Sequence, residues 1–133
     1  MIMKMSNAEI IMHVNKINEL QEREKSDNCN IFGGKIKIAY SLIKNKRAMV
    51  SALEPYNEAL KKIMEECGVE NQTTEDGKMA IKIKEGLEKT FFESVAELQA
   101  FTVDVDISKI TIDDLDGSLL NLSEIESMSF MIE

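Results

Sequence analysis

The side chains that most often carry catalytic chemistry are few in this chain of 133 residues, which has one histidine and two cysteines. No serine, cysteine or aspartate stands three or four positions from His13 on the helix expected there, and a general-base histidine normally has an orienting partner. We expect His13 at the surface or boundary of the fold. Cys29 and Cys67 show no metal or redox spacing, so we expect free thiols and no enzymatic activity.

A second group of chemically capable residues is acidic. It consists of Asp104, Asp106, Asp113, Asp114 and Asp116. Aligning Gly117 with the glycine of a calcium loop places Ile112 and Ser123 where acidic ligands are required, so the calcium-loop reading fails. Asp104 and Asp106 alternate along a predicted strand and point the same way, as metal ligands or, more often, as a solvated face that guards a strand edge. We expect no metal and no cofactor, and interpret the five aspartates as an acidic face for a partner.

The third group is basic and compact. It consists of Lys35, Lys37, Lys44, Lys46 and Arg47 around Tyr40, with no acidic residue among them. Such a run is often a solvated helix face whose long side chains cover the core. It is also suited to an anionic ligand such as a nucleotide phosphate, or to the acidic half of a neighbouring copy. We favour a binding role for these six residues.

The net charge of −8 is divided unevenly along the chain. Residues 1–67 hold 11 basic and 9 acidic residues, a net charge of +2, whereas residues 68–133 hold 5 and 15, a net charge of −10. A general nucleic-acid binder is expected to be basic, because phosphate neutralisation supplies most of its affinity. The charge therefore argues against that class.

The length and the apolar pattern of the chain predict its domain number and its location in the cell. A chain of this size is expected to form a single domain over residues 1–133. No apolar run approaches the roughly 20 residues that cross a bilayer, and residues 1–5 lack the pattern of an export signal. We expect a cytoplasmic protein with no membrane contact.

Residues 1–67 are predicted to form an antiparallel helical hairpin. Apolar residues recur every three or four positions over residues 6–24, and Ser6 with Glu9 has the spacing of a capping box. Residues 25–34 are rich in Ser, Asp, Asn and Gly and predict a loop. Residues 35–67 predict one helix of about 50 Å, calculated at 1.5 Å per residue.

An apolar stripe close to a heptad repeat supports this long helix. Its members are Ile36, Ala39, Tyr40, Ile43, Val50, Leu53, Tyr56, Leu60, Ile63, Met64 and Cys67. The first helix covers only about half of such a rod, so the remainder needs the C-terminal region or another copy of the chain. Pro55 is expected to kink the rod near residues 51–54 or to restart a helix, and Gly68 to cap its end.

Residues 68–133 are predicted to form a small acidic β-hairpin and short-helix section. The expected elements are a polar connector at 69–77, a short strand at 79–83, a helix at 90–99, an acidic strand at 101–112, a turn at 113–117, a second short strand at 119–122, and a terminal helix capped by Ser123 and Glu126. The expected fold class is α+β, mostly α, and we expect homo-oligomers through the long helix.

Several segments together resemble a family of short bacteriophage and prophage proteins of unknown function. They are KMSNAEIIMHVNKINEL, GGKIKIAYSLIKNKRAMVSALEPYNEALKKI, FESVAELQAFTVDVDISKI and LSEIESMSFMIE, and the central motif falls on Ala39, Tyr40, Lys44, Asn45, Lys46 and Arg47. The resemblance implies a small accessory protein of the host cytoplasm and implies no activity.

The expected function is that of a non-enzymatic binding protein. With the resemblance, the divided charge suggests a protein that neutralises a host factor, either as an inhibitor of a defence protein or as a sponge for an anionic nucleotide signal. The alternative is a phage assembly chaperone that shields a partner's apolar surface with its long helix.

Overall fold

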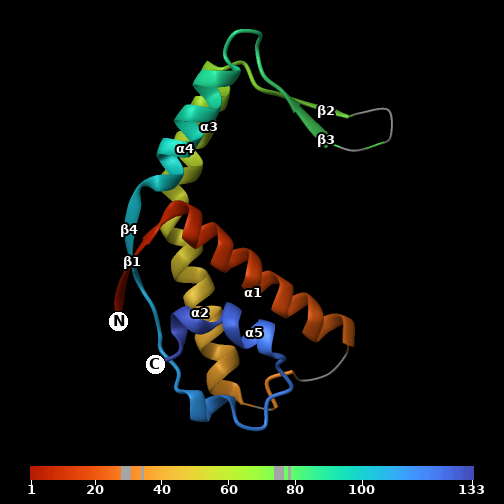
Figure 1. The fold of residues 1–133 in the computed structure, drawn as a ribbon, viewed down its shortest axis with the longest axis vertical. Helices are drawn as coiled ribbons and strands as arrows, with labels where there is room; N and C mark the ends of the chain where they lie inside the picture. The colour runs from red at the N-terminus through yellow and green to blue at the C-terminus, as the bar shows by residue number, and fades with distance from the viewer. Residues whose placement is uncertain (28–30, 34, 74–76, 78) are drawn as a thin grey trace.

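A computed structural model describes residues 1–27, 31–33, 35–73, 77 and 79–133 (Figure 1). In chain order its elements are β1 (Ile2–Ser6), α1 (Asn7–Asp27), α2 (Ile36–Ala52), α3 (Glu54–Glu66), β2 (Glu70–Thr73), β3 (Met79–Lys82), α4 (Glu88–Ala100), β4 (Thr102–Asp106), the 3-10 helix η1 (Ile112–Leu115), α5 (Leu122–Ser127) and the 3-10 helix η2 (Ser129–Met131). The strands pair as β1 with β4 and β2 with β3. The predicted α+β, mostly α class is confirmed.

The start of α1 follows the predicted capping box. The Ser6 hydroxyl oxygen accepts a hydrogen bond from the Glu9 backbone N–H at 3.1 Å, and the Ser6 hydroxyl donates to the Glu9 carboxylate at 3.2 Å. The helix buries Ile10, Ile17 and Leu20. It continues beyond the predicted end into the expected loop, and Cys29 lies outside the described residues.

The pairing of the acidic strand differs from the prediction. β4 pairs antiparallel with β1, an N-terminal strand that the sequence pattern did not predict, with Lys4 opposite Asp104. Residues 119–121, expected to form its partner strand together with Leu122, have no regular secondary structure. The Leu119 backbone N–H donates instead to the Ile31 carbonyl oxygen at 2.7 Å, so this segment is held against the turn after α1. The N-terminal strand therefore pairs with a strand from the second half of the chain.

The predicted 33-residue rod is two helices. Leu53, with φ −84° and ψ −5°, ends α2, and α3 restarts at Glu54 with Pro55 in its first turn, where a missing backbone N–H costs no helical hydrogen bond. α3 packs along α4 in the upper part of Figure 1, and the Gln99 side-chain amide donates to the Tyr56 hydroxyl at 3.3 Å. The half of the predicted rod that α1 does not cover therefore packs against the C-terminal region, one of the two possibilities expected from the sequence.

The heptad-like stripe faces inward on α3 but not on α2. Tyr56 is buried and Leu60 and Ile63 are partly buried, as predicted. On α2 the prediction holds for Ala39, which is partly buried against the core, and is wrong for the four exposed members Ile36, Tyr40, Ile43 and Val50. The buried positions there are those of a different stripe: Ile38, Leu42, Asn45 and Met49. This inner stripe has the same period but is offset by two residues, or about 200° around the helix axis at about 100° per residue.

The remaining C-terminal elements are partly as expected. β3 and α4 are confirmed, while β2 occupies part of the predicted polar connector and makes a hairpin with β3 at the far end of the molecule (Figure 1). The terminal helix is present, but its capping residues differ from the prediction. Asn121 caps α5, accepting from the Glu124 backbone N–H at 2.9 Å, while Glu124 accepts from the Asn121 backbone N–H at 3.0 Å.

Two polar clamps fix the C-terminal segment against the first helices. Asn45 is fully buried, donates to the Ser108 carbonyl oxygen at 3.0 Å and accepts from the Ser108 backbone N–H at 2.7 Å. Arg23 pairs with Glu124 and donates to the Leu119 carbonyl oxygen. The inner side of α2 and part of α1 therefore pack in the core. The outer side of α2 faces away from the core.

Candidate functional site

The outer side of α2 carries an exposed row of large apolar side chains, here named the outer stripe. Its members are Ile36, Tyr40, Ile43 and Val50, which are 83%, 64%, 44% and 46% exposed. The spacing of four, three and seven residues places them on one face of the helix. Scattered exposed apolar residues are ordinary, whereas large side chains gathered on one helix face are typical of an interaction surface.

The predicted basic residues border this stripe and do not converge on one point. By helix geometry Arg47 lies nearly in line with Tyr40, seven residues earlier. On one flank, the Lys37 ammonium lies 3.0 Å from an Asp114 carboxylate oxygen, and on the other, Lys46 donates to the Gln21 side-chain oxygen at 2.9 Å. Lys35 and Lys44 are exposed at the same helix. The result is an apolar row with a positive border.

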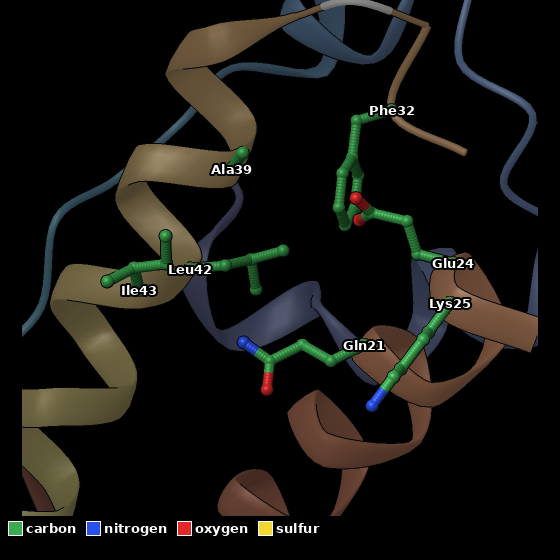
Figure 2. Close-up of a pocket in the computed structure, with 7 residues that line it drawn as sticks. All are labelled: Gln21, Glu24, Lys25, Phe32, Ala39, Leu42 and Ile43. Atoms are coloured by element: carbon green, nitrogen blue, oxygen red, sulfur yellow. The ribbon is translucent and has the colours of Figure 1, made fainter. Parts of the chain in front are cut away.

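A groove between α1 and α2 adjoins the outer stripe. One hollow of about 360 Å³ is lined by Gln21, Glu24, Lys25, Phe32, Ala39, Leu42 and Ile43. Figure 2 shows Phe32 between the two helices, Leu42 pointing into the space and Gln21 reaching from α1 toward α2. A second hollow of about 560 Å³, lined by Lys46, Arg47, Val50 and Ser51, shares Gln21 and Ile43 with the first. The two hollows form one groove along about three turns of α2.

The five predicted acidic residues occupy two separate places. Asp104 and Asp106 are exposed on β4, where Asp104 faces Lys4 across the sheet and Asp106 lies 3.0 Å from the Met1 ammonium. Asp113, Asp114 and Asp116 lie at or beside η1. They do not form a single face, and the Asp114 carboxylate pairs with Lys37 of the same chain.

Asp114 is the acidic residue with the most defined surroundings. Its carboxylate accepts a hydrogen bond from the Thr111 backbone N–H at 2.8 Å and one from the Thr111 hydroxyl at 3.1 Å. The Thr111 backbone hydrogen bond and the Lys37 ammonium lower the pKa of Asp114, because both favour its charged form. Asp114 therefore caps η1 and is committed to the fold.

His13 lies at the boundary of the fold, as its surroundings in the sequence predict. Its ring stacks on Phe130, with centroids 4.1 Å apart and an interplanar angle of 25°. Burial lowers the pKa of His13, and the nearby Glu9 carboxylate opposes that shift. The stacking makes His13 a contact between α1 and the C-terminal segment.

Other features of the described residues concern metals, thiols and membranes. Cys67 has a free, buried thiol at the end of α3. Within the described ranges, no three His, Cys, Asp or Glu side chains gather closely enough to hold a metal ion. In the same part of the chain, no helix is long and apolar enough to cross a membrane.

Several residues of the groove carry no distinctive signal in the sequence, among them Gln21 and Phe32. Gln21 on α1 lines both hollows, and Phe32, in the turn after α1, lines the first. A polar residue on a helix and an aromatic residue in a glycine-rich loop carry no distinctive spacing. Ile43 and Val50 of the groove do follow a distinctive spacing, but that spacing predicted burial, and both side chains are exposed.

Comparisons with protein-family models, curated proteins and solved structures found no match for this chain.

Proposed function

We propose that this protein is a non-enzymatic binding protein of the phage type, which neutralises a host protein by binding one of its segments along α2. The observation that carries the proposal is the outer stripe, a row of four exposed large apolar side chains beside a groove that Lys46 and Arg47 line at one end. A segment that fits has apolar side chains at helical spacing and acidic side chains beside them. Recognition of an amphipathic helix in an apolar groove follows the same pattern.

The dimensions suit a helical segment. From Ile36 to Val50 the stripe is about 21 Å long at 1.5 Å per residue, or nearly four turns. Large apolar groups on such a surface supply most of the affinity, while the bordering cations raise the association rate and select an acidic partner. Lys44 and Arg47 are exposed and suitably placed for that selection.

The arrangement favours a protein segment over a nucleotide. A phosphate site needs several donors directed at one point, whereas Lys37 and Lys46 contact other groups on opposite flanks of α2. The hollow beside Lys46 and Arg47 also contains the apolar side chains Ile43 and Val50. The nucleotide-sponge function is therefore treated as an outcome of the binding test.

The test uses a synthetic helical peptide with leucines at heptad core positions and glutamates beside them, and a matched peptide with lysines in place of the glutamates. We expect the acidic peptide to bind in a fluorescence anisotropy titration, with affinity that weakens as salt is raised. Tyr40→Asp is expected to reduce affinity at least tenfold. Phe92→Asp, at an exposed aromatic residue of α4, is the matched control and should bind as the unaltered protein does.

Equal binding of the two peptides, or unchanged binding by Tyr40→Asp, would contradict the proposal. A thermal shift with ATP or a cyclic dinucleotide, abolished by Arg47→Glu and unaccompanied by peptide binding, would support the sponge instead. The neutralised host protein is then sought by comparing captures from a bacterial lysate on the unaltered and Tyr40→Asp proteins. A partner qualifies only if Tyr40→Asp loses it and a peptide of its acidic segment binds.

A further inference from the structure

A second exposed apolar surface lies at the C-terminal end of the fold, here named the acidic apolar surface. It comprises Ile112, Asp113, Asp116, Leu122, Ile125 and Glu126. Two adjoining hollows of about 450 and 440 Å³ both include Ile112 and Ile125. Ile112 is 68% exposed and Leu122 is 82% exposed, so this surface has the same unpartnered character as the outer stripe.

The charge of this surface is opposite to that of α2. Asp113, Asp116 and Glu126 are exposed carboxylates beside the apolar side chains. Two cations from neighbouring elements are engaged within the chain: Lys37 pairs with Asp114, and Lys109 donates to the Phe130 carbonyl oxygen at 2.6 Å. The surface therefore has an apolar centre and a negative border, whereas the outer stripe has an apolar centre and a positive border.

We infer that the acidic apolar surface of one copy of this protein docks on the outer stripe of a second copy. The occupant follows from complementarity, since the chain itself carries the acidic, amphipathic chemistry that the cations around the outer stripe select. The contact joins two different surfaces and is heterologous, so each copy both offers and receives one. The inference rests on the proposed function in one respect, because a second copy and a host segment would bind the same outer stripe and therefore compete.

Self-association would regulate binding through this competition. A second copy docked on the outer stripe blocks the stripe until a segment that binds more tightly displaces that copy. The acidic peptide of the preceding section is therefore expected to dissociate the homo-oligomer as it binds. Raised salt should dissociate it as well, because the exposed charges at both borders are screened.

The test is complementation between two charge-reversed variants of the full chain. One carries Lys44→Glu and Arg47→Glu in α2, and the other carries Asp113→Lys and Asp116→Lys beside η1. All four side chains are exposed, so both variants are expected to fold, which circular dichroism and thermal melting check. The mass of each protein is followed by light scattering and sedimentation over a concentration series at low and high salt.

We expect the unaltered protein to associate in low salt and each variant alone to remain monomeric. An equimolar mixture of the two should associate again, because the acidic apolar surface of the first variant fits the unaltered outer stripe of the second, and the two charge-reversed surfaces are complementary to each other. A monomeric unaltered protein across the series, or a variant that associates as the unaltered protein does, would overturn the inference. A mixture that stays monomeric would overturn it too.

The same variants separate this inference from the proposed function. The Asp113→Lys, Asp116→Lys variant keeps the outer stripe and should bind the acidic peptide at least as tightly as the unaltered protein. Peptide binding without self-association removes only the present inference, whereas self-association without peptide binding removes only the proposed function.

Discussion

Asn45 shows how a single buried polar side chain positions the candidate site. Its amide makes two hydrogen bonds with the backbone of Ser108, and its nitrogen also lies 3.6 Å from the Met131 sulfur. A buried amide is stable only when its hydrogen-bonding groups are paired. Asn45 therefore fixes the rotation of α2, and with it the direction in which the outer stripe faces.

Replacement of Asn45 tests this positioning role. Asn45→Ala leaves the partly buried N–H and carbonyl oxygen of Ser108 without their partner, and is expected to lower the free energy of unfolding by about 2–4 kcal/mol. Urea denaturation measures the change. Asn57→Ala, at an exposed position of α3, is the control and should stay within about 0.5 kcal/mol.

His13 gives the fold a defined pH dependence. Because burial lowers its folded-state pKa, the unfolded chain takes up the proton first as pH falls below about 6.5, and stability decreases until the folded-state pKa is reached. His13→Phe keeps an aromatic ring against Phe130 and should remove this decrease between pH 7.5 and 5.5. Urea denaturation at the two pH values measures it, and an equal decrease in both proteins would exclude His13 as its source.

Asp114 affects stability only at lower pH, and therefore does not contribute to the pH dependence measured for His13. Its folded-state pKa is lowered, so its stabilising effect is complete above the unfolded value of about 3.9 and is lost as pH falls further. A scan above pH 5 therefore reports on His13 and leaves the Lys37–Asp114 pair intact.

At the scale of elements, α2 is a helix with two apolar stripes of equal period. Either stripe satisfies the sequence rule for a buried helix face, and the fold buries the inner one. On α3 only one stripe is present, so the sequence prediction of its buried face is correct. The Pro55 prediction also holds, because its cause is local: proline has no N–H and is accommodated in a first turn.

A matched pair of substitutions tests which stripe is buried. Ile36→Asp and Ile38→Asp change the same residue type two positions apart, at 83% and 0% exposure. We expect Ile36→Asp to alter the free energy of unfolding by less than about 0.5 kcal/mol and Ile38→Asp to lower it by more than about 3 kcal/mol, since a buried carboxylate is unpaired there. Equal costs in thermal or urea unfolding would mean that both stripes are covered.

At the scale of the whole molecule, the two charged halves of the chain are joined in space. β1 pairs with β4, Lys37 pairs with Asp114 and Arg23 pairs with Glu124, each contact linking residues 1–67 with residues 68–133. The polarity along the sequence therefore becomes two local surfaces, one basic and apolar on α2 and one acidic and apolar beside η1. The net charge of −8 for the whole chain does not reveal either surface.

A disulfide between β1 and β4 tests this pairing of the two halves. Lys4 and Asp104 are direct partners in the β1–β4 register, so Lys4→Cys with Asp104→Cys is expected to form a bond on oxidation. Closing a loop of about 100 residues should raise the free energy of unfolding by about 3–5 kcal/mol. Peptide mass spectrometry locates the bond, and reduction should reverse the gain.

The off-register pair is the control for that experiment. Lys4→Cys with Asp106→Cys lies diagonally across the sheet, where strand geometry separates the Cα atoms by about 7–8 Å, beyond ordinary disulfide reach. If this pair links as readily as the first, the register is wrong.

The sequence by itself determined the features whose causes are local. These are the helix periods, the Ser6–Glu9 cap, the break at Pro55, the Gly68 turn at φ +62° and the charge of each segment. The pairing of β1 with β4 could not be predicted from the sequence, because the two strands lie about 100 residues apart. An alternating pattern shows which face of a strand is buried but does not show which strand it pairs with. Only the tertiary structure decided which α2 stripe is buried: pairing β4 with β1 places Ser108 where Asn45 finds its hydrogen bonds, and the equally periodic outer stripe is left exposed.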